Sequence, residues 1–242
     1  MNLLELDLVG KSGVGSLSFN VRRVVNAGYV GRNQDAVRQH IEELQREGVA
    51  PPPAVPMLFP LSCATLTTAD RIETIEEETS GEVEFVLLVH DARIYVGIGS
   101  DHTDRRLERT DLIKSKQACP NVLGRSVWDY EDVRRHWDQL QIQSWVRSSA
   151  TGPWTPYQSA TADTILSASD IVELVRQRLC DRALDGMVIF SGTVPTLGGK
   201  VTYGAGFRCA LVDPILQRSL DCAYEVRQLD YLKSPESVAA VL

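Results

Sequence analysis

The sequence reads E-V-E-F-V-L-L-V at residues 82–89, G-S-D-H-T-D-R at 99–105 and K-S-K-Q-A-C-P at 114–120. Because successive side chains of a strand point to opposite faces, Glu82 and Glu84 are expected on one face, about 7 Å apart along the strand, with Val83 on the other. The apolar, β-branched run 85–89 is typical of a strand buried in a core. A pair of carboxylates leading into a buried strand predicts a binding site.

The chain after this strand is expected to return toward the two glutamates. Asp91 and Ala92 suit a hairpin turn, so a second strand over 94–98 delivers Asp101 close to Glu82 and Glu84. Three converging carboxylates repel one another strongly at low dielectric unless they bind a cation or protons. Oxygen ligands favour Mg²⁺, Mn²⁺ or Ca²⁺ over zinc. The competing interpretation is that these acids face water, as isolated pairs do; the attached apolar run favours the site.

The composition is that of a soluble globular protein. The 242 residues are 43% hydrophobic and carry a formal net charge of −7. This length allows one large or two small domains, and since we find no repeat, low-complexity tract or linker, we expect a single domain over 1–242. An acidic chain without a basic stripe is not expected to bind nucleic acid. The lack of a membrane-length apolar run and of a signal-peptide pattern predicts no membrane association and a cytoplasmic location.

Five cysteines are scattered through the chain and form no C-x-x-C pair. This spacing argues against a disulfide framework and against a zinc site, so most of them are expected to be small buried hydrophobic residues. Cys119 with His102 nearby is an alternative nucleophile and base. The Cys-Pro context of Cys119 is explained more simply by a turn.

The N-terminal segment, 1–27, predicts a β-hairpin, because residues 3–9 and 17–25 alternate between apolar and polar. Gly-Lys-Ser at 10–12 is not expected to be a phosphate-binding loop, since Glu5 stands where that motif requires glycine and no helix follows. We expect a flexible turn there.

The segment 28–50 predicts a helix that is attached through turns. Asn33 suits the N-cap, apolar residues at 37, 41 and 44 keep helical spacing, Gly48 suits the end, and prolines follow at 51–53. His40 and Glu43 share one face, and a carboxylate that orients an imidazole makes it a better base for activating water. The competing interpretation is an exposed charged face. A helix attached in this way is able to act as a lid.

The remaining chain is interpreted as scaffold. Helical spacing predicts helices over 127–137 and 169–179, and His136 is expected to pack or hydrogen-bond rather than bind a metal. Strands are predicted over 140–146, 154–158, 187–190, 207–212 and 223–229. The tail, 234–242, is expected to be loosely held.

Six motifs, in order, resemble those of the fumarylacetoacetate hydrolase superfamily. The likeness extends from about Gly28 to about Tyr224. G-S-D-H-T-D-R with S-K-Q-x-C-P is similar to a little-characterised branch of the superfamily, known mainly as a domain of unknown function. The motifs are Gly31-Arg32-Asn33 with His40 and Glu43, Glu82-Val83-Glu84, Asp101-x-Thr103-x-Arg105, a lysine before Cys119-Pro120, Tyr157-Gln158-x-x-Thr161 and Gly192-Thr193-x-Pro195.

The resemblance implies an α+β fold, β-rich and mixed, with a curled sheet and peripheral helices, usually in a homodimer. It implies a divalent cation, Mg²⁺ or Mn²⁺ with Ca²⁺ as a further option, held by Glu82, Glu84 and Asp101. The loop between the glutamate pair and Asp101 is shorter than in many relatives, so Asp104 is the substitute for Asp101 as the third metal ligand. In such enzymes a 2-oxo acid chelates the metal, which stabilises the enolate formed when a C–C bond breaks or a proton leaves.

The resemblance also implies roles for residues around the metal. Relatives with a paired His and Glu on a mobile helix use them to activate water, and His40 with Glu43 match that pair. Lysine and arginine assist developing negative charge; Arg105 matches, and Lys116 is chosen over its competitor Lys114. One lysine common in relatives, in an F-x-K-P-like segment, is missing from Phe-Pro-Leu-Ser at 59–62. The positions matched to substrate binding are Arg32, Gln158, Gly192 and Thr193.

The function expected from these residues and the resemblance is that of a metal-dependent hydrolase or lyase. It would cleave a C–C bond in a small 2-oxo acid or acylpyruvate-like compound. Decarboxylation, hydration and keto–enol isomerisation use the same chemistry and stay open as alternatives. A non-catalytic metal- and ligand-binding protein and a structural dimer with exposed acids are the alternatives from other classes.

Overall fold

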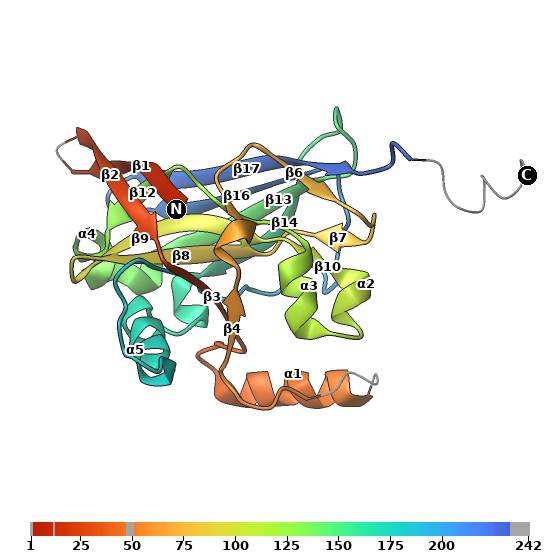
Figure 1. Cartoon of the computed structure of the whole chain (residues 1–242), viewed down its shortest axis with the longest axis horizontal. Coiled ribbons are helices and arrows are strands. Elements are labelled where there is room, and N and C mark those ends of the chain that lie inside the picture. Colours follow the sequence, from red (N-terminus) through yellow and green to blue (C-terminus); the bar gives the residue numbers. More distant parts are fainter. Residues whose placement is uncertain (1, 12, 47–50, 233–242) are drawn as a thin grey trace, which may run out of the picture.

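The computed structural model describes residues 2–11, 13–46 and 51–232. Two sheets stack through the middle of the molecule, and the helices lie at its edge (Figure 1). Within the described residues the larger sheet has ten strands, in the order β2-β1-β12-β9-β8-β15-β3-β4, with β11 joining β9 to β5. These strands are β1 (Asn2–Gly10), β2 (Gly13–Val21), β3 (Arg23–Gly28), β4 (Met57–Leu61), β5 (Leu66–Thr67), β8 (Val83–His90), β9 (Arg93–Asp101), β11 (Asn121–Leu123), β12 (Ser126–Asp129) and β15 (Met187–Phe190).

The described part of the chain contributes five strands to the second sheet, in the order β14-β13-β16-β17-β6. They are β6 (Arg71–Thr74), β13 (Gln141–Arg147), β14 (Thr155–Thr161), β16 (Gly206–Asp213) and β17 (Arg218–Gln228). A short pair, β7 (Thr79–Ser80) and β10 (Thr103–Asp104), lies beside the two sheets. The α-helices are α1 (Gln34–Arg46), α2 (Arg105–Glu108), α3 (Leu112–Ala118), α4 (Tyr130–Val133) and α5 (Ala168–Arg178), and the 3₁₀ helices are η1 (Cys63–Thr65), η2 (Arg134–Gln139) and η3 (Ala162–Thr164).

Strand β8 is buried on both faces, which explains its continuous apolar sequence. Phe85 and Leu87 belong to the core between the two sheets, whereas Val86 and Leu88 belong to a second core on the opposite face, with residues of the β1–β2 hairpin. A strand covered on both sides has no need of a polar face. Glu84 is therefore carried into the interior by the same strand that forms the centre of the fold.

The β8–β9 hairpin forms as predicted, and its turn is at Asp91 and Ala92. Both residues have positive φ, 49° and 59°, and His90 pairs with Arg93. A two-residue turn with both central residues in this region is the type I′ turn that matches strand twist. Beyond the end of β8, Glu82 and Asp101 exchange two backbone hydrogen bonds of 3.1 Å, so the pairing continues to the acidic residues.

The helix predicted over 127–137 is wrong in its first part. Residues 126–129 form β12, in which Trp128 pairs with Val96 of β9. The Asp129 side chain then accepts a hydrogen bond from Glu131 N and caps the short α4. Trp128, Val133 and Trp137 have helical spacing, but they lie in β12, α4 and η2, and all three pack in the same core.

Other boundaries also differ from those predicted. The strand expected over 17–25 is divided: β2 ends at Val21, and β3 begins at Arg23 and leaves β1 to pair with β15 and β4. Helix α5 is capped by Ser167, before the predicted start at 169. Strand β17 begins at Arg218, well before 223. The tail, 234–242, lies outside the described residues.

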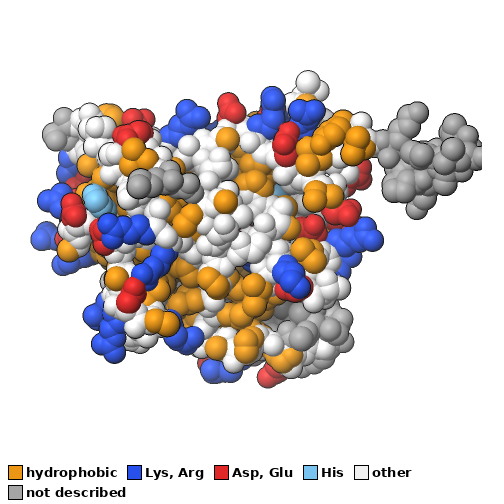
Figure 2. All heavy atoms as spheres, in the orientation of Figure 1, with side chains coloured by type: hydrophobic (Ala, Val, Ile, Leu, Met, Phe, Trp, Pro, Cys, Tyr) orange, Lys and Arg blue, Asp and Glu red, His pale blue; other side chains and the backbone are white. Residues whose placement is uncertain are grey.

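Charged side chains of both signs are interspersed around the edge of the face in Figure 2, and hydrophobic side chains gather over its lower centre.

Among the helices of the described residues, none is long and apolar enough to span a membrane.

Candidate metal centre

Three carboxylates meet where β8 begins and β9 ends. Glu82, Glu84 and Asp101 each place one carboxylate oxygen within 4.8 Å of the others. Glu84 and Asp101 are buried, with 1% and 0% of their surface exposed, and the Glu82 side chain is 17% exposed. The period-two spacing and the hairpin together bring them to one point, as the sequence predicted. Their assignment as metal ligands stays a prediction.

Neutral donors hold the two deepest carboxylates. Asn26 of β3 donates from Nδ2 to both oxygens of Glu84, each at 3.1 Å, and lies 3.2 Å from Asp101 Oδ2. The Gly192 N–H donates to Glu84 Oε2 at 3.0 Å. Gly192 has φ of +79°, and a Cβ there would collide with the carbonyl oxygen of Ala27, so glycine alone lets this backbone approach the acid.

Two cationic side chains complete the cluster. Lys116 of α3 places Nζ 2.6 Å from Asp101 Oδ2 and 3.0 Å from Glu82 Oε2. Arg105 of α2 donates to Glu82 Oε1 at 2.9 Å and to Glu108 at 2.8 Å, and its Nε donates to Ser80 Oγ at 2.7 Å. Three acids face two cations, which leaves one negative charge in the interior if all are ionised.

This charge imbalance appears in the pKa values of the acids. Burial, together with the charges of Asp101 and Glu82, raises the pKa of Glu84 well above its usual range. Burial raises the pKa of Asp101 to about 6, against the opposing effect of Lys116. Burial also acts to raise the pKa of Glu82, but Arg105 and Lys116 outweigh it and lower that pKa to about 2. The cluster therefore favours the uptake of positive charge, as a proton or as a metal ion.

A chain of hydrogen bonds supports the backbone of Glu82. The Glu82 N–H donates to Ser100 Oγ at 3.1 Å, Ser100 lies 2.9 Å from the Tyr224 hydroxyl, and Tyr224 lies 2.9 Å from His102 Nδ1. His102 Nε2 lies 2.9 Å from Thr79 Oγ1. Burial lowers the pKa of His102 to about 3, so the ring is neutral. If Nε2 of His102 carries the ring proton, the Tyr224 hydroxyl donates to Nδ1 of His102, and the Ser100 hydroxyl donates to the oxygen of Tyr224.

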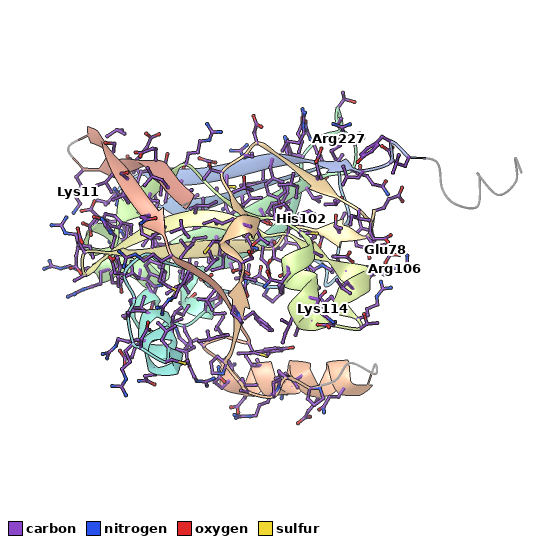
Figure 3. All side chains as sticks on the ribbon, viewed as in Figure 1. Lys11, Glu78, His102, Arg106, Lys114 and Arg227 are labelled. Atoms are coloured by element: carbon purple, nitrogen blue, oxygen red, sulfur yellow. The ribbon has the colours of Figure 1, made fainter. Side chains whose placement is uncertain are left out.

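The structure separates the two candidate lysines. Lys114 is exposed and pairs with Asp111, the N-cap of α3, whereas Lys116 is buried among the acids. In Figure 3, Lys114 lies on the part of α3 away from the sheets and His102 lies among the strands, where it is buried. Asp104 is not part of the carboxylate cluster, because its side chain caps α2 by accepting a hydrogen bond from Leu107 N.

The residues matched to substrate binding lie in two places. Arg32 is exposed and pairs with Asp138 at 2.8 Å. Gln158 accepts hydrogen bonds from Val83 N and Ser144 Oγ and donates to Thr193 Oγ1 and Val194 O. Gly192 and Thr193 thus belong to a loop tied to the start of β8.

The expected water-activating pair is on α1. The backbone of His40 and Glu43 is helical, and their side chains lie outside the described part of the chain. The alternative nucleophile, Cys119, is buried, and burial raises the pKa of its thiol to about 12. This thiol is not a ready nucleophile at neutral pH. His136 hydrogen-bonds Asp213 at 3.0 Å, in line with the packing role expected for it.

Asn26 was missed by the sequence analysis, although its position carries a signal. It interrupts the apolar run V-V-N-A at 24–27 of β3, and all four residues of this run are buried. A polar residue in such a run needs a hydrogen-bond partner in the interior. That partner is the pair Glu84 and Asp101, which come from other strands.

A second cluster, His90, Asp91 and Asp185, lies near the β8–β9 turn. Asp91 and Asp185 are exposed, and Asp185 also pairs with Arg22 at 3.3 Å. Two cavities, of about 630 and 390 Å³, are lined by the η2 region and by β5, β6 and Pro120, respectively. Neither cavity has one of the three clustered acids in its lining.

A family model described as a protein of unknown function (DUF2848) matches residues 27–224. This chain belongs to the DUF2848 family. No curated protein matches it.

Solved structures show the same fold at low sequence identity. The chain is similar to Cg1458, with a TM-score of 0.60 and 13% identity over 94% of this chain and 100% of that one. It is similar to 2-keto-3-deoxy-D-arabinonate dehydratase in complex with magnesium and 2,5-dioxopentanoate, with a TM-score of 0.62 and 16% identity over 91% and 79% of the two chains. It is also similar to 4-oxalocrotonate decarboxylase from Pseudomonas putida G7 in complex with calcium and acetate, with a TM-score of 0.54 and 14% identity over 84% and 76%. The expected β-rich α+β fold of the fumarylacetoacetate hydrolase type is confirmed.

Proposed function

We propose that this protein is a divalent-metal-dependent enzyme that cleaves a C–C bond in a small 2-oxo acid or acylpyruvate-like compound. One observation carries the metal part of the proposal. Asp101 is fully buried, and its Oδ1 has no hydrogen-bond partner within the described residues. A buried carboxylate oxygen without a partner is costly, and a cation is the ligand that such an oxygen accepts.

The three acids fit a hard divalent cation. Lys116 and Asn26 contact only Oδ2 of Asp101, which leaves Oδ1 for a metal. Glu82 and Glu84 supply carboxylate oxygens within 4.8 Å, and this all-oxygen set suits Mg²⁺ or Mn²⁺, with Ca²⁺ as a further option. When bound, the cation supplies Lewis-acid stabilisation of negative charge that develops on substrate oxygens.

The protein's own cations have a defined role in this proposal. Burial acts to lower the pKa of Lys116, but Asp101 and Glu82 outweigh it and raise that pKa above its usual range. Lys116 therefore stays positively charged and acts as an electrostatic partner, and not as a base. Burial also acts to lower the pKa of Arg105, but Glu82 and Glu108 outweigh it and raise that pKa. Arg105 therefore stays positively charged and holds the Glu82 carboxylate in place.

The His40–Glu43 pair on α1 is proposed to activate the water that attacks the scissile carbon. Dehydration or decarboxylation is the second candidate reaction, because solved structures of the same fold include a dehydratase and a decarboxylase. We also propose that the protein works in the cytoplasm as a homodimer. His40→Ala is expected to abolish hydrolysis of an acylpyruvate; if it leaves the activity of the protein intact, or if the native protein decarboxylates oxaloacetate and hydrolyses no acylpyruvate, the chemistry belongs to the second candidate.

Calorimetric titration of chelator-treated protein with Mg²⁺ and Mn²⁺ tests the proposal. The native protein is expected to bind either ion, Glu82→Ala/Glu84→Ala is expected to lose binding, and oxalate is expected to bind only when metal is present. A screen of acylpyruvates and oxaloacetate then follows. If oxalate binds equally well with and without metal, the site does not work through a cation.

A further inference from the structure

Asn121 stands directly opposite Asp101 in the large sheet. It is the first residue of β11, and its register partner on β9 is Asp101. Directly opposed residues on neighbouring strands point to the same face, with their Cβ atoms about 4.5–5.5 Å apart. Both residues have 0% of their surface exposed. Asn121 thus lies on the face of the sheet that carries the metal centre.

Asp101 and Asn121 share a second feature. In each, the Oδ1 atom is buried and has no hydrogen-bond partner in the described part of the chain. A buried polar group left unpaired loses the hydrogen bonds that it would make with water, and this destabilises the fold. Two such oxygens on directly opposed residues indicate a common partner that carries positive charge.

The orientation of the Asn121 amide follows from its other hydrogen bond. Nδ2 lies 3.2 Å from Thr65 Oγ1. The Thr65 hydroxyl has one proton, and it donates that proton to Ser62 O at 2.8 Å. With that proton on Ser62 O, Thr65 accepts from Asn121, and this network assigns the NH₂ group to the side of Thr65.

The strand order then indicates where the oxygen points. Strand β11 lies between β5 and β9, and Thr65 immediately precedes β5. Because the NH₂ group points to the β5 side, Oδ1 of Asn121 points away from it, toward the side of β9 and Asp101. The unpaired oxygens of the two residues therefore lie on the same side of β11.

We propose that Asn121 is a further ligand of the metal centre, and that its Oδ1 binds the cation held by Asp101 Oδ1. This inference rests on the metal-binding part of the proposed function. Asparagine carbonyl oxygens are ordinary ligands of hard cations. A neutral oxygen adds a ligand without adding negative charge to a cluster in which three acids already outnumber two cations.

The test compares Mg²⁺ affinity, by calorimetry at pH 8, for the native protein, Asn121→Leu and Asn121→Asp. Leucine has a similar volume and no oxygen, so this variant is expected to bind Mg²⁺ at least tenfold more weakly. Aspartate keeps an oxygen in the same place and is expected to bind as tightly as the native protein or more tightly. The control Asn20→Leu makes the same change at an exposed position of β2, and its affinity is expected to stay within about threefold.

A second measurement counts the water molecules on the bound ion. In the Mn²⁺-loaded protein, water-proton relaxation is expected to show one more exchanging water in Asn121→Leu than in the native protein. Asn121→Ala replaces the leucine variant if that variant does not fold.

The outcomes separate the two proposals. If the native protein binds Mg²⁺ and Asn121→Leu binds it equally well or better, the role of Asn121 is refuted and the carboxylate centre stands. If the leucine and aspartate variants are weakened alike, Asn121 serves packing only, and the inference is also refuted. If the native protein binds no cation, the metal centre itself is wrong.

Discussion

Gln158 is the residue that ties the separate parts of the site together. Its amide makes four hydrogen bonds, to the backbone of β8, to Ser144 of β13 and to the loop at 193–194. Gln158→Leu leaves these buried groups without partners, so the free energy of unfolding is expected to fall by about 3 kcal/mol. Urea denaturation measures this change in the free energy of unfolding. Gln143→Leu, on the partly exposed side of β13, is the control and is expected to change stability by less than about 0.5 kcal/mol. An equally small effect of Gln158→Leu would show that the four bonds do not stabilise the fold.

The pKa of Asp101 predicts an unusual pH dependence for the metal-free protein. Its folded value, about 6, lies above the ordinary 3.8, so the folded state binds the proton more tightly than the unfolded chain. The resulting stability is fully present below about pH 4 and is lost as the pH rises through 6. Glu84 acts in the same direction. The lowered pKa of Glu82 has the opposite effect, but only below about pH 4.5.

Urea unfolding of chelator-treated protein between pH 4.5 and 7.5 checks this dependence. The lowered pKa of His102 makes stability rise with pH up to about 6.5, so the native protein is compared with Asp101→Asn, in which the His102 contribution is the same. Relative to that variant, the native protein is expected to lose about 2 kcal/mol of stability across the range, and saturating Mg²⁺ is expected to abolish this relative loss. A difference between the two proteins that stays constant or rises across the range without metal would contradict the charge imbalance described for the cluster.

At the scale of residues, the sequence predicted the acids better than their partners. Glu82, Glu84 and Asp101 could be brought together from strand periodicity and one hairpin turn, which are local rules. Asn26 and Asn121 could not, because each lies on a strand that reaches the cluster only through the order of the sheet. The choice of Lys116 rested on resemblance, and the structure supports its position by burial.

The β8–β9 hairpin offers a test at the scale of elements. Ala92 has φ of 59°, where a side chain is strained, and Asp-Gly is a preferred pair for a type I′ turn. Ala92→Gly is expected to raise the free energy of unfolding by about 1 kcal/mol. Ala160→Gly, inside strand β14, is the control and is expected to lower it by about 0.5–1 kcal/mol. Destabilisation by Ala92→Gly would place the turn in another conformation.

Several elements could not be predicted from local patterns. Strands β5, β7, β10 and β11 are only two or three residues long, too short for any periodicity to show. Their pairing depends on what the rest of the fold places beside them. The same limit explains β12, where Trp128 fits a helical spacing but is held in the sheet by β9 and β1.

Cation binding is expected to stabilise the whole molecule. The folded cluster is assembled from β3, β8, β9, α2 and α3, so the unfolded chain has no comparable site. At a Mg²⁺ concentration 100 times the dissociation constant, mass action adds about 2.7 kcal/mol, which corresponds to a rise of about 5–10 °C in Tm for a chain of this size. Thermal unfolding with Mg²⁺ and with chelator measures the shift. Glu84→Gln is the control, and an equal shift in that variant would place the cation elsewhere.

The central claim is that Glu82, Glu84 and Asp101 hold one divalent cation, and a crystal structure of the Mn²⁺-loaded protein tests it most directly. Anomalous scattering locates the manganese without assumptions about its ligands. We predict one strong peak in contact with these three acids. A peak at His90, Asp91 and Asp185 alone, or no peak in manganese-soaked crystals, would contradict the account.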